Sequence, residues 1–81
     1  MAIMLMAGPQ LRAARAMAGL DRQQLAEMAE LTAQTVKRLE GMDRLRATMT
    51  TVERLQRALE AAGVVFINGD EPGVKMRRMP A

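Results

Sequence analysis

Apolar residues between positions 22 and 40 follow a helical period that stops once and then resumes. Small or apolar side chains recur on one face of each half, at Leu25, Ala26, Ala29, Leu31, Val36 and Leu39. The spacing predicts two short helices, at residues 22–29 and 33–40, which cross closely over Ala26 and share one apolar seam. This packing leaves the polar face of the second helix free, and such a face can enter the major groove of DNA.

Signals for helix ends precede this pair. Pro9 suits the first turn of a helix and Gly19 suits a C-terminal stop, so a helix is predicted from Pro9 to Ala18. Asp21 and Gln24 then have the spacing of a capping box, in which each side chain bonds the backbone N–H of the other residue. The next helix is therefore expected to begin directly after Asp21.

Further capping residues follow along the chain. Thr32 is placed to cap the helix at residues 33–40, and an irregular basic loop is expected at residues 41–49. Thr50 is predicted to cap a fourth helix, with Glu53 at the reciprocal capping position. Apolar residues then repeat at helical spacing, at Val52, Leu55, Leu59 and Ala62. This fourth helix, which ends at Gly63, is expected to close the core.

After the fourth helix the period changes. Residues 64–67 are a compact β-branched and aromatic run, and residues 74–77 alternate apolar and charged side chains. Both are predicted to be strands, joined by a six-residue loop. The predicted organisation is a flexible leader at residues 1–8, a helical domain at residues 9–63 and a β-strand tail at residues 64–81, whose last residues fray.

Composition excludes several classes of protein. The chain has 81 residues, enough for one small domain, and it has no cysteine and no histidine. Disulfides are therefore impossible, and neither a metal ion nor a cofactor is expected. No nucleophile–base pair is visible, so the chain is not expected to be an enzyme. No small-molecule effector is evident either, because no ligand-binding domain fits this length.

Charge and hydropathy indicate where the protein acts. The formal net charge is only +3, but cations outnumber acids between residues 33 and 46. A local basic surface of this kind attracts phosphates. The apolar start, Met1 to Ala7, is short and lacks a basic leading region, and no stretch is long enough to cross a bilayer. A cytoplasmic protein without a membrane partner is expected.

Several residues at fixed spacings carry a resemblance between residues 11 and 64. They are Arg15, Gly19, Leu20, Leu25, Ala26, Ala29, Leu31, Thr32, Val36, Leu39, Glu40 and Gly41. In this pattern the chain resembles the Cro/cI-like (XRE) family of helix-turn-helix repressors. The resemblance implies a mainly α, lambda-repressor-like fold, with a four-helix DNA-binding domain followed by a short C-terminal β-strand pair. Glu30 departs from the family, which usually has a left-handed glycine there, and Arg22 stands where glutamine is more common.

The resemblance also implies which side chains meet DNA. Ala33, Gln34 and Arg38 occupy positions that face base edges, where Gln can bond adenine, Arg can bond guanine and Ala can touch a thymine methyl group. The residues expected at the phosphate backbone are Arg22, Thr32, Thr35, Lys37, Arg44 and Arg46. The alternative for each is an ordinary solvated side chain, and for the two loop arginines neither interpretation is favoured.

Two further contacts are expected. The family places a paired arginine and glutamate at the positions of Arg15 and Glu40. Both faces of the strand at residues 64–67 are apolar, which suggests that the tail pairs with a second copy of the chain. The predicted dimer interface consists of Val64, Val65, Phe66, Ile67, Val74 and Met76. The alternative is that the strands fold over the fourth helix within one chain.

The predicted function is a homodimeric regulator of transcription, most simply a repressor, that binds double-stranded DNA. The helix at residues 33–40 would read one half of an inverted-repeat operator, and the second chain would read the other. The alternative is an antitoxin-like interaction module that binds a partner protein and regulates its own operon.

Overall fold

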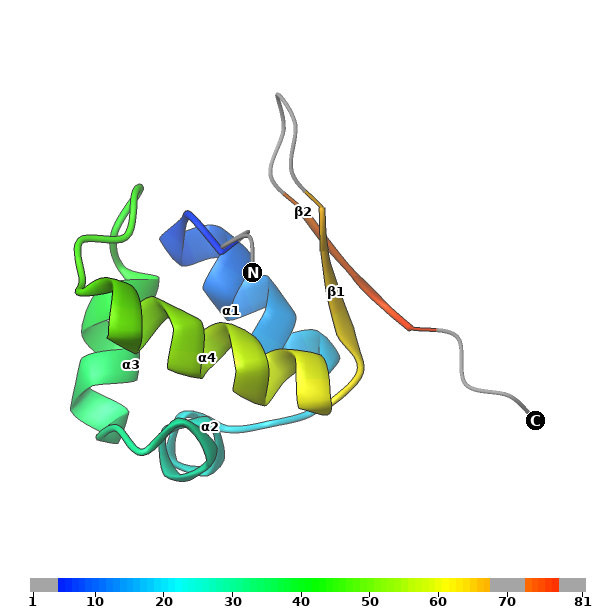
Figure 1. The fold of residues 1–81 in the computed structure, drawn as a ribbon, viewed down its shortest axis with the longest axis horizontal. Coiled ribbons are helices and arrows are strands. Elements are labelled where there is room, and N and C mark those ends of the chain that lie inside the picture. Colours follow the sequence, from blue (N-terminus) through cyan, green and yellow to red (C-terminus); the bar gives the residue numbers. More distant parts are fainter. Residues whose placement is uncertain (1–4, 68–72, 78–81) are drawn as a thin grey trace.

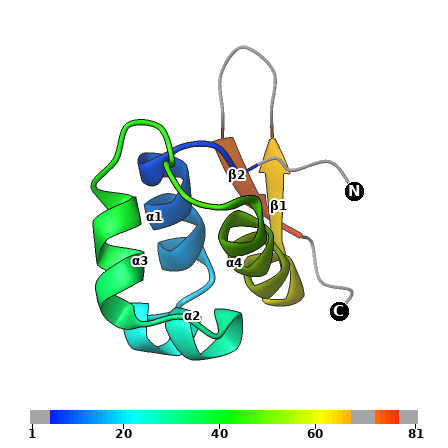
Figure 2. The same cartoon turned by 60° about the vertical axis from the view of Figure 1, so that its left-hand side comes forward.

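A computed structural model describes residues 5–67 and 73–77 of the chain. Its elements are α1 (Gly8–Met17), α2 (Arg22–Ala29), α3 (Ala33–Glu40), α4 (Met49–Ala61), β1 (Val64–Ile67) and β2 (Gly73–Met76). The α3 helix and the β1–β2 hairpin lie on opposite sides of the molecule, with α1 and α4 between them (Figure 1 and Figure 2). The predicted class, mainly helical with a short C-terminal strand pair, is confirmed. No helix in these two ranges is long and apolar enough to span a bilayer.

The capping residues expected before α2 and α3 are in place. Asp21 Oδ1 accepts a hydrogen bond from the backbone N–H of Gln24 at 2.7 Å, and Gln24 Oε1 accepts one from the N–H of Asp21 at 2.9 Å. Thr32 Oγ1 accepts from the N–H of Thr35 at 3.2 Å. Each cap satisfies backbone donors that have no partner inside the helix. These local bonds explain why α2 and α3 begin where the sequence predicts.

The start of α4 differs from the prediction. Its cap is Thr48 and not Thr50, because the Thr48 hydroxyl oxygen accepts a hydrogen bond from the N–H of Thr51 at 3.2 Å. The side chains of Thr48 and Thr51 are also bonded to each other, at 3.0 Å. Either threonine suits a cap chemically. The earlier one starts the helix at Met49, two residues before the predicted start.

The segment before α1 belongs to the core. Leu5 is only 2% exposed, and its N–H donates to Oε1 of the buried Gln56 at 3.0 Å. The carbonyl oxygen of Met6 accepts from the N–H of Leu45 at 3.0 Å. The prediction of a flexible leader over residues 1–8 is therefore wrong for its second half. The first half lies outside the described residues.

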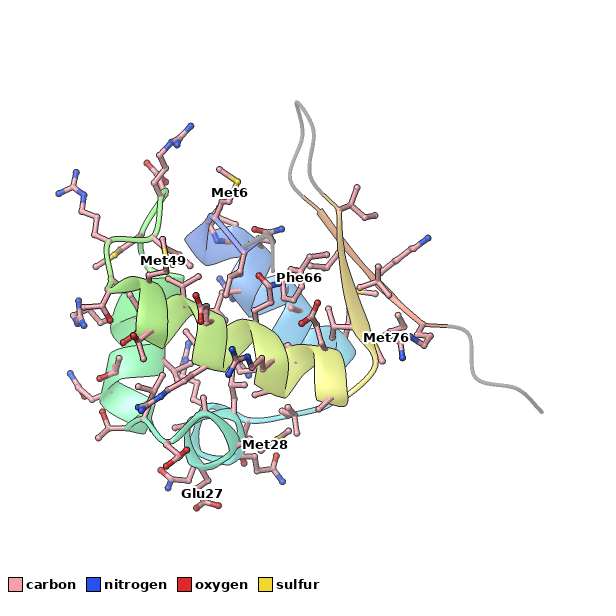
Figure 3. All side chains as sticks on the ribbon, viewed as in Figure 1. Met6, Glu27, Met28, Met49, Phe66 and Met76 are labelled. Carbon is pink, nitrogen blue, oxygen red and sulfur yellow. The ribbon has the colours of Figure 1, made fainter. Side chains whose placement is uncertain are left out.

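The hairpin closes the other side of the core. The strands are antiparallel, with Val64 opposite Met76 and Phe66 opposite Val74. Val64 and Phe66 are buried, and Figure 3 shows Phe66 pointing from the strand toward the helices. β1 lies against α4 and β2 against α1. The strands thus pair within one chain, which was the alternative considered from the sequence.

This burial corrects part of the predicted dimer interface. Val64 and Phe66 are core residues of a single chain, so neither is available to a second copy while the fold is intact. Among the described residues of the hairpin, Ile67 and Met76 are exposed apolar residues, whereas Val65 and Val74 are partly buried. The connection at residues 68–72 and the chain end at 78–81, which was expected to fray, lie outside the described residues.

Candidate nucleic-acid interface

The α3 helix has one buried face and one exposed face. Val36 and Leu39 are fully buried against the core, whereas Gln34, Lys37 and Arg38 are exposed. Figure 2 shows the helix at the edge of the molecule, with no other element covering its outer side. The separation predicted from the sequence is therefore present: the apolar residues fix the helix, and a polar face with two cations is presented outward.

The first turn of α3 carries the other candidate side chains. Ala33 and Thr35 are half-buried, whereas Thr32 is exposed. The hydroxyl oxygens of Thr32 and Thr35 are 3.0 Å apart and hydrogen-bonded to each other. Both hydroxyl groups therefore serve the cap of the helix, and each keeps further hydrogen-bonding capacity toward solvent or a ligand.

The last residue of α3 is a buried carboxylate between two guanidinium groups. Glu40 Oε2 lies 2.6 Å from Nε of Arg15, and Glu40 Oε1 lies 3.2 Å from Nη2 of Arg15. Nε of Arg22 also donates to Glu40 Oε1, at 3.1 Å. Arg15 uses Nη1 to donate to the carbonyl oxygen of Leu20 at 3.0 Å. The predicted pair of Arg15 and Glu40 is confirmed, and Arg22 is an additional partner that the sequence did not reveal.

Burial and charge make this cluster well defined. The side chain of Glu40 is 3% exposed and that of Arg15 is 16% exposed. The hydrogen bond to Glu40 raises the pKa of the Arg15 guanidinium above its ordinary value, and attraction to the carboxylates of Glu40 and Asp21 acts in the same direction, against the effect of burial. A buried carboxylate needs such partners to remain charged. The cluster therefore joins α1, α2 and the end of α3.

A second contact at the same end of α3 involves Gly8. Its N–H donates to the carbonyl oxygen of Met42 at 2.9 Å. A Cβ atom at this position would overlap that carbonyl oxygen and lie 2.7 Å from the carbonyl oxygens of Leu39 and Glu40. Glycine is thus required for the start of α1 to meet the end of α3. This role could not be predicted from the sequence, because no local pattern links Gly8 to Met42.

The turn between α2 and α3 contains a left-handed residue. Glu30 has φ 58° and ψ 45°, and among the described residues it alone, apart from glycines, has a positive φ. The N–H of the following Leu31 donates to the carbonyl oxygen of Ala26 at 2.8 Å, which closes the end of α2. This conformation costs a non-glycine residue about 1 kcal/mol. The left-handed conformation that the resemblance implies at this position is therefore present.

The loop after α3 presents two more cations. Arg44 and Arg46 are exposed, and neither pairs with an acidic side chain within the described ranges. The backbone N–H of Arg46 donates to the sulfur of Met42 at 3.4 Å, which shapes the loop. Both arginines are therefore free to meet an anion, as an ordinary solvated arginine also is.

Residues 5–67 and 73–77 contain no group of three or more acidic, histidine or cysteine side chains that could hold a metal ion. No protein-family model matches the chain, and no curated protein matches it in sequence. The function must therefore be argued from the geometry of the chain itself.

Proposed function

We propose that the protein binds double-stranded DNA in a sequence-specific way and regulates transcription, as a helix-turn-helix protein of the Cro/cI-like type. In this proposal α3 enters the major groove and α2 crosses above it. The observation that carries the proposal is α3 itself: its apolar face is buried, its end is held by the buried carboxylate of Glu40, and its outer face carries Gln34, Lys37 and Arg38.

The exposed side chains suit base recognition. Gln34 can bond adenine N6 and N7 together, and Arg38 can bond guanine O6 and N7 together. The two residues are four positions apart, so they lie on the same face of the helix, about one turn from each other. Their separation along the helix axis is about 6 Å, which corresponds to roughly two base-pair steps. The methyl group of Ala33 is small enough to approach a thymine methyl group. A half-site containing both adenine and guanine is therefore expected.

The surrounding cations suit the phosphate backbone. Because Glu40 is buried between two arginines, its charge does not offset the exposed cations on α3 and the following loop. Those exposed cations are Lys37, Arg38, Arg44 and Arg46, against one exposed acid, Asp43. Arg22, Thr32 and Thr35 complete the proposed phosphate contacts. Neutralising phosphates releases counterions, so binding should weaken steeply as salt rises.

Selection of bound duplexes from a random library, followed by mobility-shift titration, tests the proposal. Arg38→Ala should lose about 1–3 kcal/mol of binding at each half-site and relax the base preference at one position. Lys37→Ala should instead weaken all sequences alike and reduce the salt dependence. Arg77→Ala is the control, because Arg77 is exposed and directly follows β2, and the hairpin lies on the opposite side of the molecule from α3 (Figure 1). Unchanged affinity and sequence preference in Arg38→Ala would contradict the proposal.

We propose a homodimer as well, because one recognition helix reads too few base pairs to find an operator. A dimer interface at the hairpin would place the two α3 helices far apart. α3 and the hairpin lie on opposite sides of the molecule (Figure 1 and Figure 2), so two chains joined through their hairpins hold their α3 helices at the far ends of the pair. Half-sites one helical turn apart, roughly 34 Å, favour an interface closer to α3.

Two substitutions decide between these surfaces. Ile67 is 42% exposed on the hairpin, and Met49, at the start of α4, is 67% exposed (Figure 3). Replacing either by lysine leaves the described core intact, so only the variant at the true interface should lower the mass measured by sedimentation. Point variants are used because a deletion of residues 64–81 would also remove the core residues Val64 and Phe66. A wild-type chain that sediments as a monomer with operator DNA would contradict the dimer.

A further inference from the structure

We infer that Glu40 is a positioning residue that holds Arg22 in place to grip a backbone phosphate. The inference deepens the proposed DNA binding and rests on it. Arg22 is the first residue of α2, and its Nε donates to Glu40 Oε1 at 3.1 Å. The contact with the buried carboxylate uses only Nε of the guanidinium among the described residues, and the side chain of Arg22 remains partly exposed.

Exposure separates the roles of the two arginines in the cluster. The side chain of Arg22 is 42% exposed, whereas that of Arg15 is 16% exposed. Arg15 uses Nε, Nη1 and Nη2 on partners within the chain. In the described part of the chain, the two terminal nitrogens of Arg22 donate no hydrogen bond. Every guanidinium nitrogen of Arg15 therefore has a hydrogen-bond partner within the chain, whereas Arg22 keeps two nitrogens available for a ligand.

The cluster also carries an excess of positive charge. Two guanidinium groups share a single carboxylate, so Arg15, Arg22 and Glu40 together carry one net positive charge. The side chain of Arg22 is the more exposed of the two arginines, so it presents the accessible part of that charge at the molecular surface. A planar guanidinium with two free terminal nitrogens matches two oxygens of one phosphate group.

Fixing the guanidinium changes how it binds. A free surface arginine loses side-chain freedom when it grips a phosphate, which weakens binding. Arg22 has lost part of that freedom already, because Glu40 holds its Nε. Since Glu40 is also the last residue of α3, one carboxylate fixes both the phosphate contact and the end of the helix proposed to read the bases. Glu40 thereby keeps the proposed phosphate contact of Arg22 at a fixed position relative to α3.

Substitutions of Arg22 test the inference without breaking the pair of Arg15 and Glu40. Arg22→Gln removes the charge, and Arg22→Lys keeps the charge but removes the planar group that spans Glu40 and the phosphate. Arg77→Lys is the matched control, because Arg77 is exposed directly after β2, has no ion-pair partner among the described residues and lies outside the proposed interface. Each variant is titrated with a short random-sequence duplex over a series of salt concentrations, and its melting temperature is recorded.

The expected results differ between the variants. Arg22→Gln should reduce the slope of log affinity against log salt by about 0.9 for each chain bound. Arg22→Lys should keep that slope but bind about 2- to 10-fold more weakly, whereas Arg77→Lys should bind like the wild type.

Three outcomes would overturn the inference. An unchanged slope in Arg22→Gln, even with a lowered melting temperature, would mean that Arg22 only stabilises Glu40. Wild-type affinity in Arg22→Lys would mean that Arg22 acts as a loose charge. Both outcomes leave the proposed function intact, whereas a wild-type protein that bound no duplex would overturn the inference and the proposed function together.

Discussion

The two ends of α3 are held by different kinds of interaction. At the C-terminal end, Glu40 is buried between two arginines and the backbone of Gly8 lies directly against the last carbonyl groups. At the N-terminal end, the exposed hydroxyl of Thr32 caps the helix after a strained, left-handed Glu30. Buried charge and close backbone packing are costly to disturb, whereas an exposed cap contributes about 1 kcal/mol. The helix is therefore fixed mainly at its C-terminal end.

This difference between the two ends suits the proposed role of α3 as a recognition helix. In a recognition helix the first residues contact base edges, so they must remain exposed and cannot be held by burial. Glu40, the last residue of α3, makes no proposed contact with DNA and can therefore be buried. Substitutions at the two ends should therefore differ in size, with large losses of stability at the C-terminal end and small changes at the N-terminal end.

Gly8→Ala should have the largest effect. The added Cβ would overlap the carbonyl oxygen of Met42, so α1 or the end of α3 must move, at a cost of roughly 3 kcal/mol. For a domain of this size the melting temperature should fall by about 10–20 °C. Gly41→Ala is the control, because Gly41 has φ −83° and a Cβ there would lie 3.5 Å from the nearest atom, the carbonyl oxygen of Arg38.

Thermal denaturation followed by circular dichroism measures both variants. Gly41→Ala should change stability by less than about 1 kcal/mol in either direction. Equal melting temperatures for the two alanine variants would contradict the close approach of α1 to the end of α3.

Glu40→Gln should have the second largest effect. The substitution leaves the guanidinium of Arg15 beside a neutral amide, and removing one partner of a buried pair costs about 3–5 kcal/mol. Because Arg15 and Arg22 are partly exposed, solvent reduces the expected loss to about 2–3 kcal/mol. Glu53→Gln is the control: its partner Arg57 lies at 3.6 Å, and both side chains reach solvent.

Urea denaturation gives the two free energies of unfolding. The exposed pair in α4 has i,i+4 spacing, so its loss should cost less than about 0.5 kcal/mol. If Glu40→Gln were no more destabilising than Glu53→Gln, the buried cluster would not be what fixes the end of α3.

Thr32→Ala should cost about 1 kcal/mol, because the N–H of Thr35 loses its acceptor. Thr48→Ala is a matched control, since Thr48 caps α4 through an equivalent bond to the N–H of Thr51. Both variants should lose similar stability in urea denaturation. Only Thr32→Ala should also weaken binding to duplex DNA, and equal binding by the two variants would remove Thr32 from the proposed interface.

The sequence predicted those features that depend on neighbouring residues. The capping box at Asp21 and the cap at Thr32 each involve residues within a few positions of one another, whereas the left-handed turn at Glu30 was implied by the resemblance to a family. Helical periodicity then placed Val36 and Leu39 on the buried face. The pair of Arg15 and Glu40 was also predicted, but through resemblance to a family and not from local spacing.

Features that depend on distant contacts were not predicted. Gly8 precedes Pro9 like an ordinary helix start, and only the folded chain places it against Met42. Phe66 was assigned to a second chain, because a hydrophobic strand does not reveal whether its partner is α4 or another protein. Leu5 was assigned to a flexible leader, although the fold buries it. The shared bond of Arg22 to Glu40 likewise has no sequence signal.

Glu30→Gly should have the smallest effect, and it should stabilise the protein. Glu30 is exposed and its φ is 58°, so glycine removes backbone strain without losing a buried contact. The strain relieved, about 1–2 kcal/mol, is partly offset by the greater freedom of glycine in the unfolded chain, about 0.4–1 kcal/mol. The melting temperature should therefore rise by about 3–6 °C.

Gly19→Ala is the reciprocal control, because Gly19 has φ 72° and no atom within 4 Å of an added Cβ. Alanine there adds strain without a steric clash, so the melting temperature should fall. A lower melting temperature in Glu30→Gly would mean that the side chain of Glu30 stabilises the turn by more than its backbone conformation costs.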